Sequence, residues 1–248
     1  MCFPSKRTKD IHKDATQPDT AKQDPPQQPA NEPIDVQEQA PEPEMSTPRV
    51  AIIIYSMFGH IAKMAESVKA GVEAAGGTTT IFQIPETLPE EILTKMHAPP
   101  KPDYPVFSDI NKLSEFDAFI FGIPTRYGNF PAQWKVFWDQ TGGLWGSGAL
   151  TKKYASVFVS TASPGGGQEM TVSNAISTFT HHGIIFVPLG YAAVFGQLTN
   201  TAEVHGGSPW GAGTFAGPDG SRQPTALELE VAKIQGQKFW EHVVKVKF

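Results

Sequence analysis

The sequence predicts an α/β domain in which a doubly wound, five-stranded parallel sheet carries helices on both faces. Two observations support this prediction. Residues 50–55 are apolar and rich in β-branched side chains, too few for a helix and too continuous for a half-exposed strand, so they are expected to be buried on both faces. From Arg49 onward, apolar runs alternate with segments of helical spacing, which is typical of doubly wound sheets.

The elements follow in a regular order, and no internal repeat interrupts them. The expected strands cover residues 50–55, 78–83, 118–123, 154–160 and 184–188. The expected helices begin near Ile61 and then cover about 132–140, 169–182 and 225–247. Residues 85–105 are rich in proline and are expected to form a surface excursion. The glycine-rich GGLWGSG is expected to be a loop, and the segment before the last helix to be irregular.

Composition limits the class of protein. The chain has 248 residues, 40% of them hydrophobic, and a formal net charge of −5. The body of the chain contains no basic cluster with interleaved aromatic residues, so binding to nucleic acid has no electrostatic support. The apolar tract at 184–195 is interrupted by Pro188 and Gly190 and is too short to span a bilayer. The single cysteine, Cys2, and the lack of an apolar secretory signal favour the cytoplasm.

Residues 1–46 differ from the rest and are predicted to be a disordered N-terminal tail, with the folded domain covering 47–248. The tail is rich in Pro, Gln and charged residues and has one aromatic residue, Phe3. Two interpretations of Cys2 stay open. It is an ordinary cysteine, or it is lipidated and gives peripheral membrane association together with the basic residues beside it, which are Lys6, Arg7, Lys9 and Lys13.

Three loops of suggestive chemistry follow the first, third and fourth strands. They cover residues 56–61, 124–131 and 160–168, and in a parallel sheet all three lie at the carboxyl ends of the strands. The first leads into a helix, whose free N–H groups and positive dipole end favour a phosphate, although an ordinary connecting loop has the same sequence features. The other two would flank a flat ring. A flat ring with one phosphate describes FMN.

The sequence lacks the motifs of two other kinds of nucleotide-binding site. The chain contains no G-x-x-x-x-G-K-[ST] motif, and no G-x-G-x-x-G follows the first strand. A P-loop NTPase and a dinucleotide-binding Rossmann domain are therefore disfavoured.

Several long motifs, spread over residues 49–248, together carry a family resemblance. They are YSMFGHI, FGIPTRYGN, DQTGGLWGSGAL, STASPGGGQE, HHGIIFVPLGY and GGSPWGAGTFAGPDGSRQP. In this order they resemble the motifs of WrbA-type NAD(P)H:quinone oxidoreductases, a flavodoxin-like family, in a fungal-type member with an N-terminal extension. The resemblance implies FMN as cofactor, NADH or NADPH as electron donor, and two-electron reduction of a quinone to a hydroquinone by ping-pong hydride transfer. It also implies a homotetramer, a dimer of dimers, and a role in oxidative stress.

The resemblance assigns site residues motif by motif. The FMN-phosphate loop is Ser56, Met57, Phe58, Gly59, His60 and Ile61. The isoalloxazine loop is Pro124, Thr125, Arg126, Tyr127, Gly128 and Asn129. The second flavin-edge loop is Ser160, Thr161, Ala162, Ser163, Pro164, Gly165, Gly166 and Gly167. His181 is expected to reach the flavin from another part of the assembly, and the quinone is expected to meet Phe58, Trp145 and His181. No metal and no protein nucleophile is expected, because the chemistry takes place on FMN.

Some features depart from the family pattern or allow a second interpretation. The family often has Tyr at the position of Phe58, Pro164 lengthens its loop by one residue, and the tail has no counterpart. Arg126 is either a surface charge or a stabiliser of the negative charge on a reduced flavin. His181 and His182 also suit a helix C-terminus, and Trp134, Trp138 and Trp240 suit the core. The alternative function is an FMN-binding scaffold or electron carrier without quinone reductase activity.

The glycine-rich segment 190–223 carries Phe195, Trp210 and Phe215 with little charge. It is therefore expected to be a contact surface between subunits.

Overall fold

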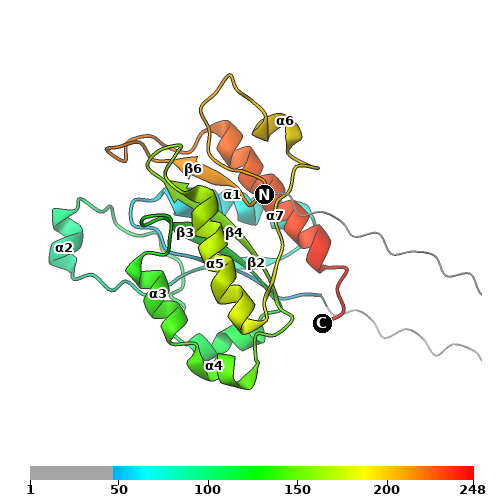
Figure 1. The fold of residues 1–248 in the computed structure, drawn as a ribbon. Helices are drawn as coiled ribbons and strands as arrows, with labels where there is room; N and C mark the ends of the chain where they lie inside the picture. The colour runs from blue at the N-terminus through cyan, green and yellow to red at the C-terminus, as the bar shows by residue number, and fades with distance from the viewer. Residues whose placement is uncertain (1–46) are drawn as a thin grey trace, which may run out of the picture. The chain divides into compact units, whose positions relative to one another are not determined.

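The computed structural model describes residues 47–248, and the predictions for residues 1–46 lie outside the described residues (Figure 1). A parallel sheet with the order β2-β1-β3-β4-β5 forms the centre, and β6 pairs with β4 beside this path. The strands are β1 Val50–Ile54, β2 Thr79–Gln83, β3 Ala118–Pro124, β4 Tyr154–Thr161, β5 Ile185–Phe186 and β6 Gly213–Phe215. The five predicted strands and the flavodoxin-like strand order are thus confirmed.

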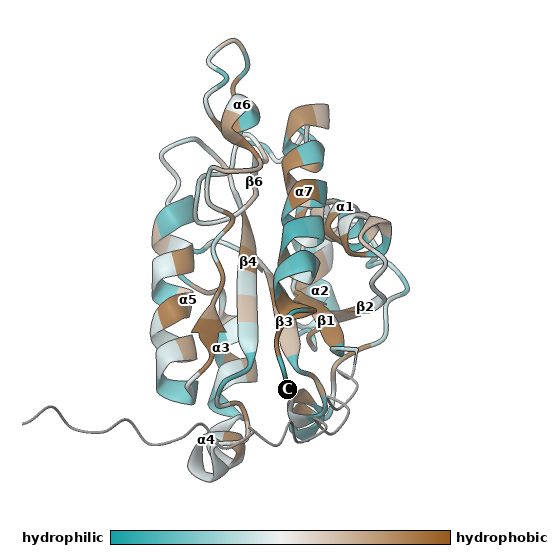
Figure 2. Cartoon of the chain, turned by 90° about the vertical axis from the view of Figure 1, so that its right-hand side faces the viewer, coloured by the Kyte–Doolittle hydropathy of each residue, from teal (hydrophilic) through white to brown (hydrophobic). Residues whose placement is uncertain are grey.

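The helices cover both faces of this sheet. They are α1 His60–Ala74, α2 Glu90–Lys95, α3 Ala132–Asp139, α4 Gly142–Ser147, α5 Gln168–His182, α6 Phe195–Leu198 and α7 Ala226–Val243, with a 3-10 helix η1 at Ile110–Glu115. Figure 2 shows α3 and α5 on one side of the sheet and α1 and α7 on the other. No helix within residues 47–248 combines the length and the apolar character that crossing a membrane requires.

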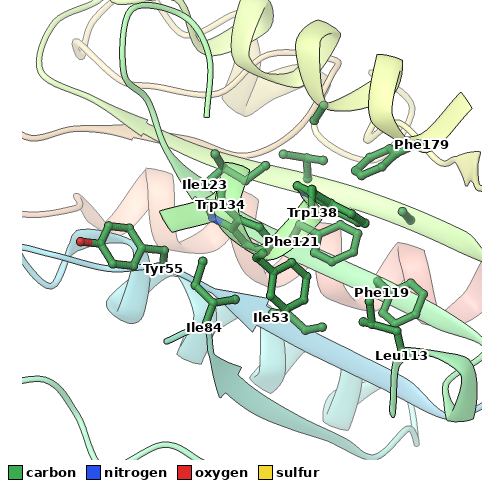
Figure 3. Close-up of a cluster of buried hydrophobic side chains, with 14 of the residues drawn as sticks. Ile53, Tyr55, Ile84, Leu113, Phe119, Phe121, Ile123, Trp134, Trp138 and Phe179 are labelled. Carbon is green, nitrogen blue, oxygen red and sulfur yellow. The ribbon is translucent and has the colours of Figure 1, made fainter. Parts of the chain in front are cut away.

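The central strands are apolar on both faces because both faces are covered. Every residue of β1 is buried, and Ile52 lies between Ile81 and Ile120 of the neighbouring strands. On the α3 and α5 side, the ring of Phe121 lies 5.6 Å from Trp134, 5.4 Å from Trp138 and 5.4 Å from Phe179 (Figure 3). These aromatic contacts fix two helices on the sheet.

On the other face, α1 and α7 pack at very close range. A side chain at Gly236 would lie 2.0 Å from the carbonyl oxygen of Val68, and one at Gly71 would lie 1.8 Å from that of Lys233. Only glycine allows this approach of two backbones. Trp134, Trp138 and Trp240 are buried, as predicted for core residues.

The structure corrects three local predictions. The segment expected to be irregular contains α6 and β6, and β6 pairs with Val159–Thr161 of β4. β5 has two residues rather than five, because Pro188 has no N–H to donate and the carboxyl end of β4 already pairs with β6. GGLWGSG is not a loop, since it forms α4 up to Ser147 and ends in Gly148 with a φ of 68°.

Candidate cofactor site

The three predicted loops meet at the carboxyl end of the sheet, where they line one hollow of about 690 Å³. The predicted site residues in its lining are Ser56, Met57, Phe58, His60, Ile61, Pro124, Thr125, Arg126, Ser160, Thr161 and Ala162. The lining does not include Gly59, Tyr127, Gly128, Asn129 or any residue of 163–167. The sequence therefore located the hollow, and the structure narrows the set of residues that face it.

The loop between β1 and α1 contains a row of free donors. None of the backbone N–H groups of residues 57–61 has an acceptor within the described part of the chain. The next N–H along the chain, that of Ala62, donates to Oγ of Ser56 at 3.2 Å. Gly59 precedes the helix with a φ of +88°, a conformation that strains any other residue. Free N–H groups at the positive end of a helix form an anion site.

His60 lines the hollow but does not leave its imidazole free. The side chain is buried, and its Nε2 lies 2.8 Å from the carbonyl oxygen of Arg222. Because a carbonyl oxygen can only accept, Nε2 carries the proton and donates. His60 thus joins the β1–α1 loop to a segment 162 residues further along the chain.

The second loop contains a tight turn. Arg126 and Asn129 exchange two backbone hydrogen bonds of 2.9 Å, and the residues between them, Tyr127 and Gly128, have φ values of 56° and 71°. Positive φ at both central residues is typical of a type I′ turn, and a left-handed φ costs a residue such as Tyr127 about 1–3 kcal/mol. Tyr127 is nevertheless fully exposed. It lines a second hollow of about 870 Å³ that shares Met57, Met96 and Arg126 with the first.

The third loop touches the second. A side chain at Gly167 would lie 3.0 Å from Cα of Gly128, so glycine is needed where the two loops meet. The N–H groups of Ala162 and Ser163 have no acceptor among residues 47–248, which leaves them available for the edge of a ligand. Thr171 joins the same region, because its hydroxyl lies 2.8 Å from that of Thr125.

The hollow has two further walls that sequence reasoning missed. One is the middle of the excursion between β2 and β3, which contributes Met96, His97 and Pro99. The other is the turn at residues 216–220. The second belongs to the quoted motif GGSPWGAGTFAGPDGSRQP, but that motif was assigned to a subunit contact. Phe215 is no part of such a contact surface, since it is buried within its own chain as part of β6, whereas Phe195 of the same segment is exposed.

Glu86 fixes the start of the excursion against the sheet. Its carboxylate accepts from the Tyr55 hydroxyl at 2.9 Å, from Nζ of Lys101 at 2.6 Å and from Nε2 of Gln133 at 3.1 Å. Burial opposes ionisation, but the bonds from Lys101 and Tyr55 and from the N–H groups of Leu88 and Thr87 outweigh it and lower the pKa of Glu86. Burial, and after it the bond to Glu86, raises the pKa of the Tyr55 hydroxyl. The Tyr55–Glu86 pair therefore holds the excursion in place and does not serve as a reactive group.

Trp145 and His181 do not lie at this hollow within one chain. Helix α3 starts beyond the carboxyl end of β3 and leads through α4 to the start of β4, while α5 ends just before β5. Both residues are therefore at the amino end of the sheet, where Trp145 on α4 is 60% exposed and His181 is also exposed. The neighbouring His182 is buried against Thr141, with 2.9 Å between Nε2 and Oγ1. Burial, followed by repulsion from His181, lowers the pKa of His182.

Comparisons with known proteins agree with this geometry. The family model described as NADPH-dependent FMN reductase matches residues 48–197. The chain belongs to this family. The NAD(P)H quinone oxidoreductase PST3 of Candida albicans is 61% identical over 198 residues, which cover 80% of this chain and 99% of that protein. The "Protoplast secreted protein 2" of Saccharomyces cerevisiae is 62% identical over 198 residues, with the same coverage of both chains. The resemblance stated from the motifs is thereby confirmed.

A solved structure supports the fold. The crystal structure of a flavodoxin, WrbA-like protein from Agrobacterium tumefaciens aligns with a TM-score of 0.54 at 22% identity, covering 81% of this chain and 99% of that chain. The chemistry of the hollow suits the FMN named by the family. It offers a row of N–H donors for a phosphate, and the third loop adds the free N–H groups of Ala162 and Ser163, which can meet the edge of a ring.

Proposed function

We propose that this protein is an FMN-dependent NAD(P)H:quinone oxidoreductase that reduces quinones to hydroquinones by two electrons. The observation that carries the proposal is the row of N–H groups at residues 57–61, which have no acceptor within the described chain and open onto the hollow at the carboxyl end of the sheet. The names of the Candida albicans relatives support the choice of quinone as acceptor and of a nicotinamide as donor.

Bound FMN would supply the redox chemistry, accepting a hydride from the nicotinamide and passing two electrons to the quinone in a ping-pong sequence. The residues of the chain bind, orient and exclude water. The N–H groups of residues 57–61 would hold the phosphate. Arg126 makes no ion pair within residues 47–248, so its charge is available to favour a negatively charged reduced ring. Phe58, 41% exposed, and Met57 offer an apolar wall to a flat substrate.

The proposal includes an oligomer, the homotetramer that the family resemblance implies. Trp145 and His181 lie at the opposite end of the sheet from the hollow, so only another copy of the chain can bring them to it. Large side chains are exposed where copies would meet. Trp145, Tyr191 and Phe195 have 60%, 49% and 65% of their surface exposed. Light scattering that gives the mass of one chain at micromolar concentration would reject this assembly.

Purified protein tests the reaction. The proposal expects yellow protein that oxidises NADH or NADPH rapidly only when benzoquinone is present, with one hydroquinone formed per nicotinamide. Protein that binds FMN but turns over slowly with every quinone would instead be the electron carrier or scaffold. Colourless protein that takes up no added FMN would contradict the cofactor site itself.

A further inference from the structure

Helix α7 begins with a carboxylate that is fully buried and has many partners. Glu228 accepts from the N–H of Gly206 at 2.8 Å, from the Thr214 hydroxyl at 2.8 Å and from the N–H of Thr225 at 2.9 Å. Its two oxygens also accept from the guanidinium of Arg222, at 3.0 and 3.1 Å. A buried carboxylate needs such donors, and a two-fold bond from arginine also fixes direction.

Arg222 uses its remaining donors on two other segments. One bond goes to the carbonyl oxygen of Phe215, at the end of β6, at 2.6 Å, and another to that of Val204 at 3.0 Å. Its own N–H donates to the carbonyl oxygen of Ala216 at 3.0 Å. The ion pair with Glu228 therefore closes residues 216–222 into a loop of fixed shape, which we call the 216–222 loop.

The 216–222 loop connects two of the three cofactor loops. The N–H groups of Ala216 and Gly217 donate to the carbonyl oxygens of Thr161 and Ala162 at 2.8 and 3.0 Å. At its other end, the carbonyl oxygen of Arg222 accepts from Nε2 of His60. His60 is the first residue of α1, and its N–H belongs to the row without acceptors. A continuous chain of hydrogen bonds thus runs from Glu228 to the anion site.

We infer that the Arg222–Glu228 pair positions the phosphate subsite of the flavin through the carbonyl oxygen of Arg222 and the side chain of His60. His60 is then a positioning residue, which holds the start of α1 so that the N–H groups of residues 57–61 converge on one anion. The inference rests on the proposed function, because it takes the anion to be the phosphate monoester of FMN. It goes beyond the proposed function by stating that the His60 side chain bonds to the carbonyl oxygen of Arg222 and not to the flavin.

The inference has a consequence that a general loss of stability does not share. Releasing His60 loosens the donors for the phosphate but leaves Thr125, Ser160 and Ala162 in place around the ring. Affinity for FMN should fall, while affinity for riboflavin, which has the same ring and no phosphate, should change little. Gln at position 60 can present a donor at the place of Nε2, whereas Phe has a similar ring and no donor.

The experiment titrates wild-type apoprotein and the His60→Phe and His60→Gln variants with FMN and, separately, with riboflavin, following the quenching of flavin fluorescence. We expect His60→Phe to raise the Kd for FMN by about tenfold or more, the equivalent of one displaced strong contact, and the Kd for riboflavin by less than about twofold. His60→Gln should recover most of the FMN affinity. Equal losses for both flavins, or no loss for FMN, would overturn the inference.

A second break in the same chain of bonds makes the test independent of how one variant folds. Glu228→Gln should lower the affinity for FMN by more than the affinity for riboflavin, which also falls because the 216–222 loop bonds to Thr161 and Ala162. Glu230→Gln, at an exposed position two residues along α7, should lower neither. Selective loss with Glu230→Gln as well would overturn the inference. If wild-type protein binds neither flavin, the proposed function fails. If it binds FMN and all variants match it, the proposed function stands and only the inference fails.

Discussion

Helices α1 and α7 pack side by side on one face of the sheet, yet the residues that lead into them differ (Figure 2). At the start of α7, the Thr225 hydroxyl accepts from the N–H of Glu228 and the Glu228 carboxylate accepts from the N–H of Thr225, which completes a capping box. At the start of α1, the residue before the helix is Gly59, which has no side chain, the Ser56 hydroxyl accepts from the N–H of Ala62, and the N–H groups of residues 57–61 have no acceptor in the described chain.

The difference shows where to look for a ligand. Both helix starts carry the same orphan donors and the same partial charge. In each helix one N–H of the first turn donates to a hydroxyl, but the turn before α1 adds the free N–H groups of residues 57–59. Because donors without partners cost free energy, we expect an external acceptor at this turn. The comparison makes a distinct prediction for each helix.

Removal of the Glu228 carboxylate, which belongs to the capping box of α7, should have the largest effect on stability. Glu228→Ala leaves the guanidinium of Arg222 without its carboxylate and several buried donors without acceptors, so we expect a loss of about 3–5 kcal/mol in the free energy of unfolding. Urea denaturation measures it. Glu230→Ala, at an exposed position of the same helix, should stay within about 0.5 kcal/mol. Similar values for the two variants would show that α7 does not depend on its cap.

A side chain at the open start of α1 should act on both stability and the cofactor. Gly59→Val imposes a left-handed φ on a β-branched residue, for about 1–2 kcal/mol, and stiffens the backbone that is expected to approach the phosphate. We expect purified protein with little flavin. Gly76→Val is a matched control, since Gly76 has a φ of 84° and open space around it but lies beyond the other end of α1. A Gly59→Val protein with full flavin content would contradict the placement of the phosphate.

These two helix starts also show how far the sequence alone predicts the molecule. The strands were predictable because continuous apolar runs such as β1 have one stable environment, a sheet covered on both sides. The turn at residues 56–61 could be predicted as a candidate anion site because its position, after β1 and before a helix, is a local feature of the sequence. In contrast, α4 was missed because GGLWGS has low helix propensity, and β6 because three residues beginning with glycine give no periodic signal.

The missed walls of the hollow have a common cause. Met96 and His97 reach it because Glu86, Tyr55 and Lys101 fasten the excursion, and residues 216–220 reach it because Arg222 and Glu228 close their loop. These bonds join residues that are distant in sequence or that only tertiary packing brings together, so no local sequence pattern predicts them. The bond from the His60 side chain to Arg222 could not be predicted for the same reason, because tertiary packing brings the two residues together.

A substitution at the amino end of the sheet should have a smaller effect, on quinone turnover and not on FMN binding. Trp145→Ala should leave FMN bound and lower kcat/KM for quinones by about fivefold or more, because an aromatic wall contributes stacking and excludes water. Trp145→Phe, which keeps an aromatic ring, should retain most of the activity. Steady-state kinetics with several quinones measures both. Unchanged constants for Trp145→Ala would remove this residue from the substrate site and weaken the case that a second copy completes it.

Deletion of residues 1–46 should have the smallest effect. The segment has few apolar side chains to offset the entropy of ordering, so we expect the melting temperature to change by less than about 2 °C and quinone turnover to stay the same. Any role would then be in cellular placement. Fractionation of cells that express the full chain, a Cys2→Ser variant and the truncated form tests this, and identical distributions of all three would reject membrane association through Cys2.

The open start of α1 is tested most directly by titrating wild-type apoprotein with FMN, riboflavin and inorganic phosphate in a calorimeter. The account predicts one FMN per chain and riboflavin binding weaker by about tenfold or more, because the phosphate supplies the acceptor that residues 57–61 lack. Inorganic phosphate should compete with FMN and leave riboflavin binding unaffected. Equal affinity for FMN and riboflavin, with no competition by phosphate, would contradict the account.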